Sequence, residues 1–454
     1  MMHYHLIGIG GIGMSGIAHL LLKRGIQVSG SDVKTNKSTD ALAALGAEIF
    51  IGHDARNIKG ADLIIYSSAI AGNNPEILAA QPKNIPYIKR AQALANLMLD
   101  KTVITVTGSH GKTTTASLIS FMLLKAGFAP TIAVGGIMRN IDTNAYWGEG
   151  DYFVAEADES DGTFLYYLPK YSVITNIDRE HLDYYKDFDT EVRAFADYIG
   201  STRDDGCLFC CNDDPILKRL LADSRKKYVF FGLQETADIF PRNIVMKDLT
   251  SGFDCFYRGK LLDRFFLNLG GLHNVSNAMA VIALGLEMGI DKAVMKEALS
   301  EFKGAGRRLE IKFKDEKYLL LDDYAHHPTE IQATLQAVKN LGYRRIVAVF
   351  QPHRFSRTKL LLDEFGKCFG AADKVMVTDI YAASEPPVEG VSAGSVCDKI
   401  KEHLPGKAVE FVLKDDILSR VMEGLEYGDV IITLGAGDIA KVSDQIAGEL
   451  RKLF

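Results

Sequence analysis

The stretch TVITVTGSHGKTTTASLISFMLLKAG, residues 102–127, decides how this chain folds. Its first five residues form a short apolar run that predicts a buried strand. The residues from 116 onward predict a helix, and Gly127 is placed to end it, because glycine is favoured just after helix C-termini. A glycine-rich loop joins strand and helix, and this order is typical of nucleotide-binding α/β domains.

The loop itself, TGSHGKTTT, is predicted to bind phosphate. Backbone N–H groups at the start of the helix would point at an anion, Lys112 adds a positive charge, and the Thr113 hydroxyl can hold Mg²⁺. The spacing G-x-x-G-K-T is two residues shorter than the common phosphate-loop pattern, so an ordinary helix-start turn is the alternative. The preceding strand and the lysine favour phosphate. The residues expected there are Gly108, Ser109, His110, Gly111, Lys112, Thr113 and Thr114.

Similar strand and helix patterns extend to both sides of this unit and predict an α/β protein with parallel sheets. We expect three domains: a Rossmann-like domain at residues 1–98, a central phosphate-loop domain at 99–306 and a second Rossmann-like domain at 307–454. A stretch from about 201 to 270 is interpreted as rich in turns. The apolar segments that predict strands outside the opening stretch are HLIGI (5–9), IQVSGSD (26–32), ADLIIYSS (61–68), YFVAEAD (152–158), SVITNI (172–177), CLFCC (207–211), YLLL (318–321), IVAVF (346–350), DKVMVTDI (373–380) and DVIITL (429–434).

A second glycine-rich turn follows the first predicted strand and opens the first predicted helix. Its glycines are Gly8, Gly10, Gly11 and Gly13, and Asp32 follows the next strand at the distance of a dinucleotide fingerprint. A nicotinamide enzyme would place Asp32 on an adenosine ribose. The same turn can hold any ligand that contains a pyrophosphate, or serve only helix packing.

Polar residues also follow two strands of the predicted central domain. Glu156 ends one strand, where open α/β sheets place their ligands, and its carboxylate can bind Mg²⁺. The neighbouring Asp158, Glu159 and Asp161 are interpreted as solvated loop acids. His181 follows the next strand, as either a second metal ligand or a loop histidine.

Two loops of the third predicted domain carry candidate site residues. Residues 322–330, DDYAHHPTE, hold acids and histidines between a strand and a helix. Residues 351–358, QPHRFSRT, place Arg354 and Arg357 three positions apart, a pair that can clamp a carboxylate or a phosphate. Solvated surface charge is the alternative for both loops.

Composition excludes several classes of protein. With 454 residues, 52 Lys plus Arg and 58 Asp plus Glu, the chain has a net charge of −6, whereas nucleic-acid binders are usually basic. No apolar run approaches the roughly 20 residues that span a bilayer. Six cysteines are too few for a disulfide scaffold, and Cys207, Cys210 and Cys211 are expected to be buried, reduced side chains. We therefore expect a soluble cytoplasmic protein.

Eight segments together resemble one family, the ATP-dependent Mur ligases of peptidoglycan synthesis. The resemblance covers essentially the whole chain, with the segments in the family's order. They are GIGGIGMSGIA (8–18), TGSHGKTTT (107–115), EADESD (156–161), TNIDREHLD (175–183), GLHNVSNA (271–278), GAGRR (304–308), DDYAHHPTE (322–330) and QPHRFSRT (351–358).

The resemblance implies an activity: ligation of L-alanine to UDP-N-acetylmuramate, driven by ATP with Mg²⁺, through an acyl phosphate. The first domain would bind the UDP-sugar, the second ATP and the third the amino acid. One alternative is a ligase that attaches a preformed peptide to the same UDP-sugar in cell-wall recycling. Alternatives of other classes are a nicotinamide-dependent oxidoreductase and a slow nucleotide switch. The oxidoreductase would have no role for TGSHGKTTT, and the switch would need neither a second nucleotide loop nor the loops of the third domain.

The resemblance also implies roles for individual residues. Gly8 to Gly13 and Asp32 would hold the UDP moiety, Lys112 the ATP phosphates, Thr113 and Glu156 one Mg²⁺, and His181 a second. Asn274, Asn277, Arg308 and Asp323 would lie on the adenine and ribose side of ATP. Residues implied to handle alanine and the reacting phosphates are Arg307, Tyr324, His326, Arg354 and Arg357.

Overall fold

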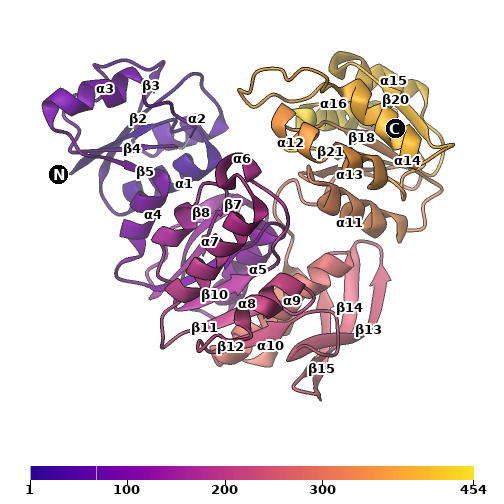
Figure 1. Ribbon diagram of the computed structural model, residues 1–454, viewed down its shortest axis with the longest axis horizontal. Coiled ribbons are helices and arrows are strands. Elements are labelled where there is room, and N and C mark those ends of the chain that lie inside the picture. Colours follow the sequence, from indigo (N-terminus) through magenta and orange to yellow (C-terminus); the bar gives the residue numbers. More distant parts are fainter. Residues whose placement is uncertain (1, 68, 454) are drawn as a thin grey trace. The chain divides into compact units, whose positions relative to one another are not determined.

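The computed structural model describes residues 2–67 and 69–453 and contains three sheets, each flanked by helices (Figure 1). The expected α/β class with parallel sheets is confirmed. Of the predicted strand segments, only the last residue of ADLIIYSS, Ser68, lies outside the described residues.

The first sheet has the strand order β3-β2-β1-β4-β5, and its neighbouring strands pair in parallel. The order reverses beside β1, which creates the switch point where open α/β sheets bind ligands. The elements are β1 (His3–Ile7), α1 (Ile12–Lys23), β2 (Gln27–Asp32), α2 (Lys37–Ala44), β3 (Glu48–Ile51), β4 (Leu63–Tyr66), α3 (Pro75–Ala80), η1 (Gln81–Lys83), β5 (Tyr87–Lys89) and α4 (Arg90–Met98).

The second sheet has ten strands in the order β15-β14-β13-β12-β11-β10-β6-β9-β7-β8. Its centre, β6, pairs in parallel with β9 and β10, so their carboxyl ends meet at one edge. The elements up to β10 are β6 (Thr102–Thr107), α5 (Lys112–Lys125), β7 (Thr131–Met138), β8 (Thr143–Tyr146), β9 (Tyr152–Glu156), η2 (Thr163–Tyr166) and β10 (Tyr171–Ile174). Those that follow are α6 (Leu182–Tyr185), α7 (Phe188–Ser201), β11 (Cys207–Cys211), α8 (Pro215–Leu221), β12 (Tyr228–Phe231), β13 (Ile239–Lys247), β14 (Thr250–Tyr257), β15 (Lys260–Leu267), α9 (Leu272–Glu287) and α10 (Lys292–Glu301).

Helix α5 is buried over most of its length, from Thr113 to Leu123. A helix that is apolar on all sides is stable only when it is covered on all sides, and this burial fixes the loop that precedes it. Its C-terminal end is the predicted one: the helix stops at Lys125, and Gly127 follows with a left-handed φ of 77°.

The interpretation of residues 201–270 as a stretch rich in turns is wrong. Besides β11, this stretch contains β12, β13, β14 and β15, which extend the sheet on one side. The expectation that the three cysteines of β11 are buried is confirmed, and burial raises the pKa of each thiol.

The third sheet has the order β16-β17-β21-β18-β19-β20, parallel except for the pair β16 and β17. Successive residues of β17 point to opposite faces: Leu319 and Leu321 pack in one apolar cluster and Leu320 in another. The elements are β16 (Glu310–Lys314), β17 (Leu319–Asp323), α11 (Pro328–Lys339), β18 (Arg345–Phe350), α12 (Phe355–Leu360), α13 (Leu362–Lys367), β19 (Lys374–Val377), α14 (Ala393–His403), β20 (Ala408–Phe411), η3 (Lys414–Asp416), α15 (Ile417–Glu423), β21 (Asp429–Leu434) and α16 (Ile439–Lys452).

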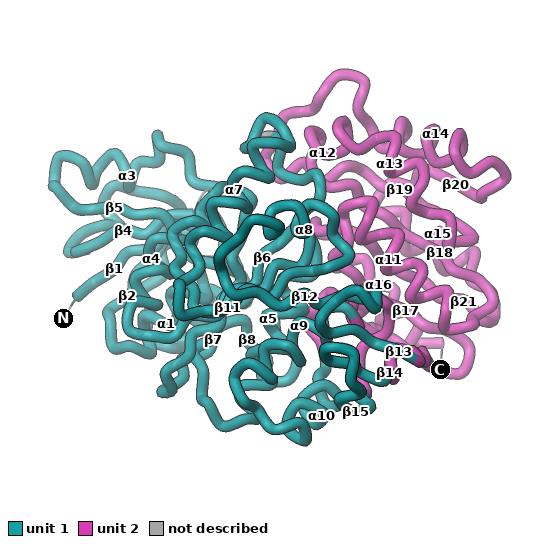
Figure 2. Tube along the Cα trace, turned by 60° about the horizontal axis from the view of Figure 1, so that its bottom comes forward, with its two compact units in different colours: residues 1–242, 254–265, 276–303 teal, residues 243–253, 266–275, 304–454 magenta. Residues whose placement is uncertain are grey.

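The chain divides into two compact units, coloured separately in Figure 2. Unit 1 comprises residues 1–242, 254–265 and 276–303, and unit 2 comprises residues 243–253, 266–275 and 304–454. Within residues 2–67 and 69–453, no helix combines the length and apolar character needed to cross a bilayer.

Candidate active site

The central glycine-rich loop runs from the end of β6 to the start of α5. Gly108 has a left-handed φ of 117°, and a Cβ atom there would lie 2.3 Å from Thr175 Oγ1 and 2.7 Å from the carbonyl oxygen of Asn176. Only glycine fits so close a backbone approach. Asn176 also fixes the loop, because its Oδ1 accepts from the N–H of His110 at 2.9 Å and its Nδ2 donates to the His110 carbonyl at 3.0 Å.

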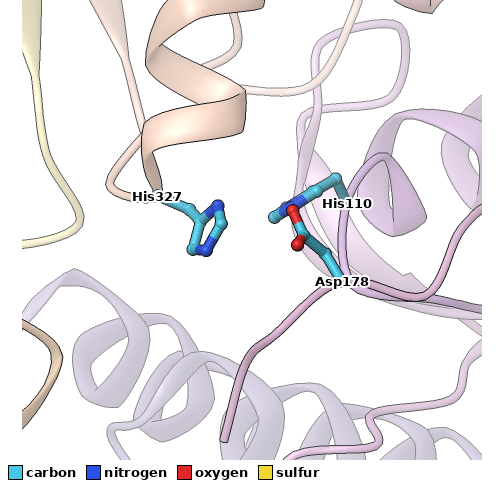
Figure 3. Close-up of side chains that lie close together, drawn as sticks. All are labelled: His110, Asp178 and His327. Atoms are coloured by element: carbon cyan, nitrogen blue, oxygen red, sulfur yellow. The ribbon is translucent and has the colours of Figure 1, made fainter. Parts of the chain in front are cut away.

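The side chains of the loop are held by the segment after β10. The backbone N–H of Asp178 donates to Ser109 Oγ at 2.8 Å. The His110 ring and the Asp178 carboxylate face each other in Figure 3, with 2.9 Å between Nε2 and Oδ2. Two strand ends therefore build one rigid loop, the form that phosphate binding needs.

Lys112 is the first residue of α5, and its ammonium group lies inside the loop. Its side chain is 13% exposed, and Nζ lies 2.7 Å from Oε1 of Glu159. Burial alone would lower the pKa of Lys112, but the negative charges of Glu159 and Asp158 raise that pKa above its ordinary value. The Lys112 side chain is therefore a fixed cation at the start of a helix. Its charge and the positive end of the helix dipole both favour an anion at this place.

Thr113 and Glu156 form a pair of oxygen donors beside the loop. The Thr113 hydroxyl donates to Glu156 Oε2 at 2.9 Å, and the N–H of Gly135 donates to the same oxygen at 2.7 Å. Burial raises the pKa of Glu156, while the charge of Lys112 lowers it. A hydroxyl next to a carboxylate is a hard-oxygen donor set, so these residues fit Mg²⁺.

A second donor group consists of Glu159, Glu180 and His181, whose ligand atoms lie within 4.8 Å of one another. His181 has a left-handed φ of 55°, a strained conformation that is often found at functional sites. Burial lowers the pKa of His181, but the neighbouring Glu159 and Glu180 raise it overall. This group could hold a divalent cation.

The interpretation of Glu159 as a solvated loop acid is wrong, because its side chain is fully buried. Asp158 fits that interpretation better, with 40% of its side chain exposed. The pattern EADESD gave no signal that separates the two acids.

Glu191 of α7 is a buried carboxyl group next to this cluster. Among the described residues neither of its oxygens has a hydrogen-bond partner. Burial raises the pKa of Glu191 to about 9, and the charges of Glu159 and Glu180 add to the effect. The folded protein therefore keeps a proton on Glu191 that the unfolded chain releases above about pH 4.5.

This pKa shift makes a prediction about stability. The contribution of the bound proton is present at low pH and is lost as pH rises from about 4.5 toward 9. Glu191→Gln, which stays neutral, is expected to be more stable than the wild type by roughly 2 kcal/mol or more at pH 8, and about equal at pH 4.5. Thermal unfolding across this pH range measures the difference. A constant difference at all pH values would contradict the assigned proton.

The N-terminal glycine turn lies between β1 and α1. The Gly8 N–H donates to the Ser31 carbonyl at 2.8 Å, and the Gly10 N–H donates to Asp32 Oδ2 at 2.8 Å. Gly11 immediately precedes α1, and Gly13 lies in its first turn. The structure thus brings Asp32 to the turn, as a hydrogen-bond acceptor for its backbone.

Arg90 was not found from the sequence, yet it lies at this turn. A Cβ atom on Gly13 would be 2.7 Å from Arg90 Nη1, and Arg90 Nη2 is 3.6 Å from Asp158 Oδ2. The guanidinium therefore connects the N-terminal turn with the loop after β9. A single arginine after a short strand carries no signal of this position.

Helix α9 carries the two predicted asparagines. Asn277 Oδ1 lies 3.0 Å from the position of a Cβ on Gly111, so Asn277 is beside the central loop. Asn274 is buried and donates to the Gly270 carbonyl at 2.7 Å. Burial and the charge of Arg308 lower the pKa of His273 to about 4, so its ring is neutral.

In unit 2, the predicted residues fall into two neighbouring sets. Arg307 donates to Asp322 Oδ2 at 3.0 Å, and its guanidinium lies 5.2 Å from the ring of Tyr324. The Arg308 guanidinium lies 5.1 Å from the centroid of the same ring. Asp323 accepts from the N–H groups of Leu309 and Ala325, and burial raises its pKa to about 6 although Arg308 opposes this.

The second set is connected by His353, a residue of the QPHRFSRT segment for which no role was predicted. Its ring packs against His326 at 5.6 Å, and its Nδ1 accepts from Arg357 Nη1 at 3.1 Å. Burial, followed by the charges of His326 and Arg357, lowers the pKa of His353 to about 3. Tyr324 also packs against His326, at 5.3 Å. Ring contacts therefore join Tyr324, His326 and His353, and a hydrogen bond to His353 adds Arg357 to the set.

Arg354 forms its ion pair with an acid outside this set. It precedes α12 with a φ of 66°, and its Nη1 is 3.9 Å from Oε1 of Glu385. The Glu385 carboxylate also accepts from the N–H and hydroxyl of Ser356, at 3.0 and 2.7 Å. The position of the arginine is thus fixed by the loop after β19.

Three models of known protein families match successive segments of the chain. Residues 3–102 match the model of the Mur ligase family catalytic domain, residues 106–285 the Mur ligase middle domain, and residues 307–437 the glutamate ligase domain of Mur ligases.

Individual relatives are similar over nearly the full length. A UDP-N-acetylmuramate–L-alanine ligase of Desulfosudis oleivorans is 44% identical over 98% of this chain and 97% of its own. The crystal structure of a UDP-N-acetylmuramate-alanine ligase from Thermotoga maritima matches with a TM-score of 0.86 and 31% identity over 100% of both chains. A murein peptide ligase from Psychrobacter arcticus shares the fold, with a TM-score of 0.73 and 23% identity over 99% of both chains.

Proposed function

This chain belongs to the Mur ligase family, and we propose on that premise that it joins L-alanine to UDP-N-acetylmuramate in peptidoglycan synthesis, with ATP as the energy source. The observation that carries this proposal is the central loop. A buried lysine, a glycine-rich helix start and a hydroxyl–carboxylate pair lie together there. The choice of alanine rests on the similar full-length ligases.

The reaction has two steps. An oxygen of the lactyl carboxylate attacks the γ-phosphorus of ATP, the bond to the β–γ bridging oxygen breaks, and ADP leaves. The amine of L-alanine then attacks the carbonyl carbon of the acyl phosphate, loses a proton and expels inorganic phosphate. Activation is needed because a carboxylate is a poor acyl donor, and no protein nucleophile is required.

In the first step two anions must approach each other, so catalysis depends on alignment and charge neutralisation. We assign Lys112 to the ATP phosphates, together with the backbone of Gly108, Ser109, His110, Gly111 and Thr114. Asn274, Asn277, Arg308 and Asp323 are assigned to the adenine and ribose side. The support is the loop geometry and the position of Asn277 beside Gly111.

Magnesium is the metal we propose, with Thr113 and Glu156 as ligands of one ion and His181 as a ligand of a second. A bound Mg²⁺ would neutralise phosphate charge during transfer. The protein residues fix the donors in advance: Gly135 holds the Glu156 carboxylate, and the strained backbone of His181 directs its ring toward Glu159 and Glu180.

We assign the UDP-sugar to the first sheet. Gly8, Gly10, Gly11 and Gly13 would face the pyrophosphate, Asp32 would support the turn, and Arg90 adds the positive charge that the glycines lack. We also propose the domain boundaries that go with these assignments. The UDP-sugar domain would comprise residues 1–98, the ATP domain residues 99–306 and the amino-acid domain residues 307–454.

The amino-acid side of the reaction is assigned to unit 2. Tyr324, His326, Arg354 and Arg357 would bind alanine, and Arg307 would assist the reacting phosphates. The support is the set of ring contacts around His353 and the hydrogen bond from Arg357 to its Nδ1. We further propose a cytoplasmic location, where UDP-sugars and ATP are available.

The test is a coupled assay of phosphate release with purified protein, ATP, Mg²⁺ and UDP-N-acetylmuramate. We expect release with L-alanine and little with a preformed tripeptide, which the peptide-ligase alternative requires. Release with the tripeptide alone would replace the proposed acceptor. Release that needs no UDP-sugar would contradict the ligase assignment itself.

A further inference from the structure

All three hydrogens of the Lys112 ammonium group are engaged within the protein. Nζ donates to the carbonyl oxygens of Gly108 at 2.6 Å and Ser109 at 3.1 Å, and to Glu159 Oε1 at 2.7 Å. An ammonium group has three donors. A phosphate oxygen can therefore bind Nζ only by displacing one of these acceptors, and Glu159 is the one outside the loop.

Glu159 is held in place independently of the lysine. Its carbonyl oxygen accepts from the Tyr185 hydroxyl at 2.5 Å, which ties its backbone to α6. Its carboxylate is fully buried, and in the described part of the chain Oε2 has no hydrogen-bond partner. The next nitrogen donor, His181 Nε2, lies 3.6 Å from Oε1. Lys112 is thus the main partner of a buried charge.

We propose that Glu159 is a positioning residue that holds the Lys112 ammonium while the loop is empty, and that it competes with the nucleotide phosphates for this lysine. The inference rests on the proposed role of Lys112 in nucleotide binding. When phosphates bind, Lys112 exchanges one anionic partner for another, and Glu159 keeps His181 within reach. The intact protein therefore binds nucleotide less tightly than its lysine would allow.

The test is the affinity of the full-length protein for ADP, measured by calorimetry in EDTA so that metal ligation has no part. Glu159→Gln is expected to bind ADP about ten-fold more tightly than the wild type, because a charge-assisted hydrogen bond no longer competes. Asp158→Asn is the matched control. The Asp158 carboxylate lies in the same loop, and its charge also acts on Lys112, but it makes no hydrogen bond to the ammonium group. Its replacement therefore removes a charge without removing a hydrogen bond. We expect it to change the affinity by less than about three-fold.

Two results would overturn the inference: equal or weaker ADP binding by Glu159→Gln, or equal tightening by Asp158→Asn, which would indicate general charge repulsion. Glu159→Asp is the second variant, used if the first is destabilised. It keeps the charge but withdraws the carboxylate by one methylene, so a smaller tightening is expected and no tightening contradicts the inference.

A kinetic measurement separates this role from a structural one. The KM for ATP is expected to fall in Glu159→Gln, whereas damage to the fold would raise it. The outcomes for the two proposals also differ. Absence of ADP binding by the wild type would count against the proposed function, while equal binding by wild type and variant overturns only the role of Glu159.

Discussion

Lys112→Ala is expected to lower the rate of ADP formation by at least about 10³-fold, because the fixed positive charge at the transferred phosphate is lost. The affinity for UDP-N-acetylmuramate should change by less than about two-fold, since we assign the sugar nucleotide to a different sheet. Product formation by coupled assay and sugar-nucleotide binding by calorimetry measure the two quantities separately.

The matched control is Lys125→Ala, which removes a lysine from the other end of the same helix. Lys125 pairs with Glu297 and Glu301 on the surface, at 2.7 and 2.6 Å. Exposed pairs of this kind contribute little to stability, so activity within about two-fold of the wild type is expected. Equal loss of sugar-nucleotide binding and phosphate transfer in Lys112→Ala would contradict the division of roles between the two glycine-rich loops.

Glu156→Gln is expected to reduce kcat by about 10²- to 10³-fold, because the amide keeps the shape of the side chain but loses the charge that would hold a metal ion. The concentration of Mg²⁺ needed for half-maximal activity should rise. The hydrogen bonds from Thr113 and Gly135 reach an oxygen that glutamine retains, so the fold should persist.

Thermal unfolding without metal is the control for Glu156→Gln, and we expect no loss of stability, since burial already raises the pKa of the carboxyl group. A variant with unchanged kcat and unchanged Mg²⁺ requirement would remove Glu156 from the metal site. A variant that melts much earlier than the wild type would assign it a structural role instead.

The class of fold and the central loop could be predicted because their signals are local. The apolar run before Gly108 and the helix that ends before Gly127 depend on neighbouring residues only. The strands between residues 228 and 267 were missed for a local reason too. Pro241 lies inside β13, and charged residues interrupt the apolar alternation of β15.

The partners of the site residues could not be predicted, since they arise from contacts between distant segments. Glu159 looks like its neighbour Asp158 in the sequence, and only the packing of α5 and α6 around it makes it a buried partner of Lys112. Arg90 lies in no quoted motif, and the segment QPHRFSRT that contains His353 does not indicate which residues this histidine contacts. The roles of the side chains were therefore predicted from the family resemblance, whereas their hydrogen bonds and ion pairs became known only from the structure.

The central claim is that the lactyl carboxylate receives the γ-phosphoryl group of ATP before the amide forms. The most direct measurement uses UDP-N-acetylmuramate labelled with ¹⁸O in that carboxylate, followed by mass analysis of the phosphate released in the presence of L-alanine. Transfer of one labelled oxygen to each phosphate is predicted, because the carboxylate oxygen that attacks phosphorus leaves with it. Phosphate without the label, released while the amide forms, would contradict the account.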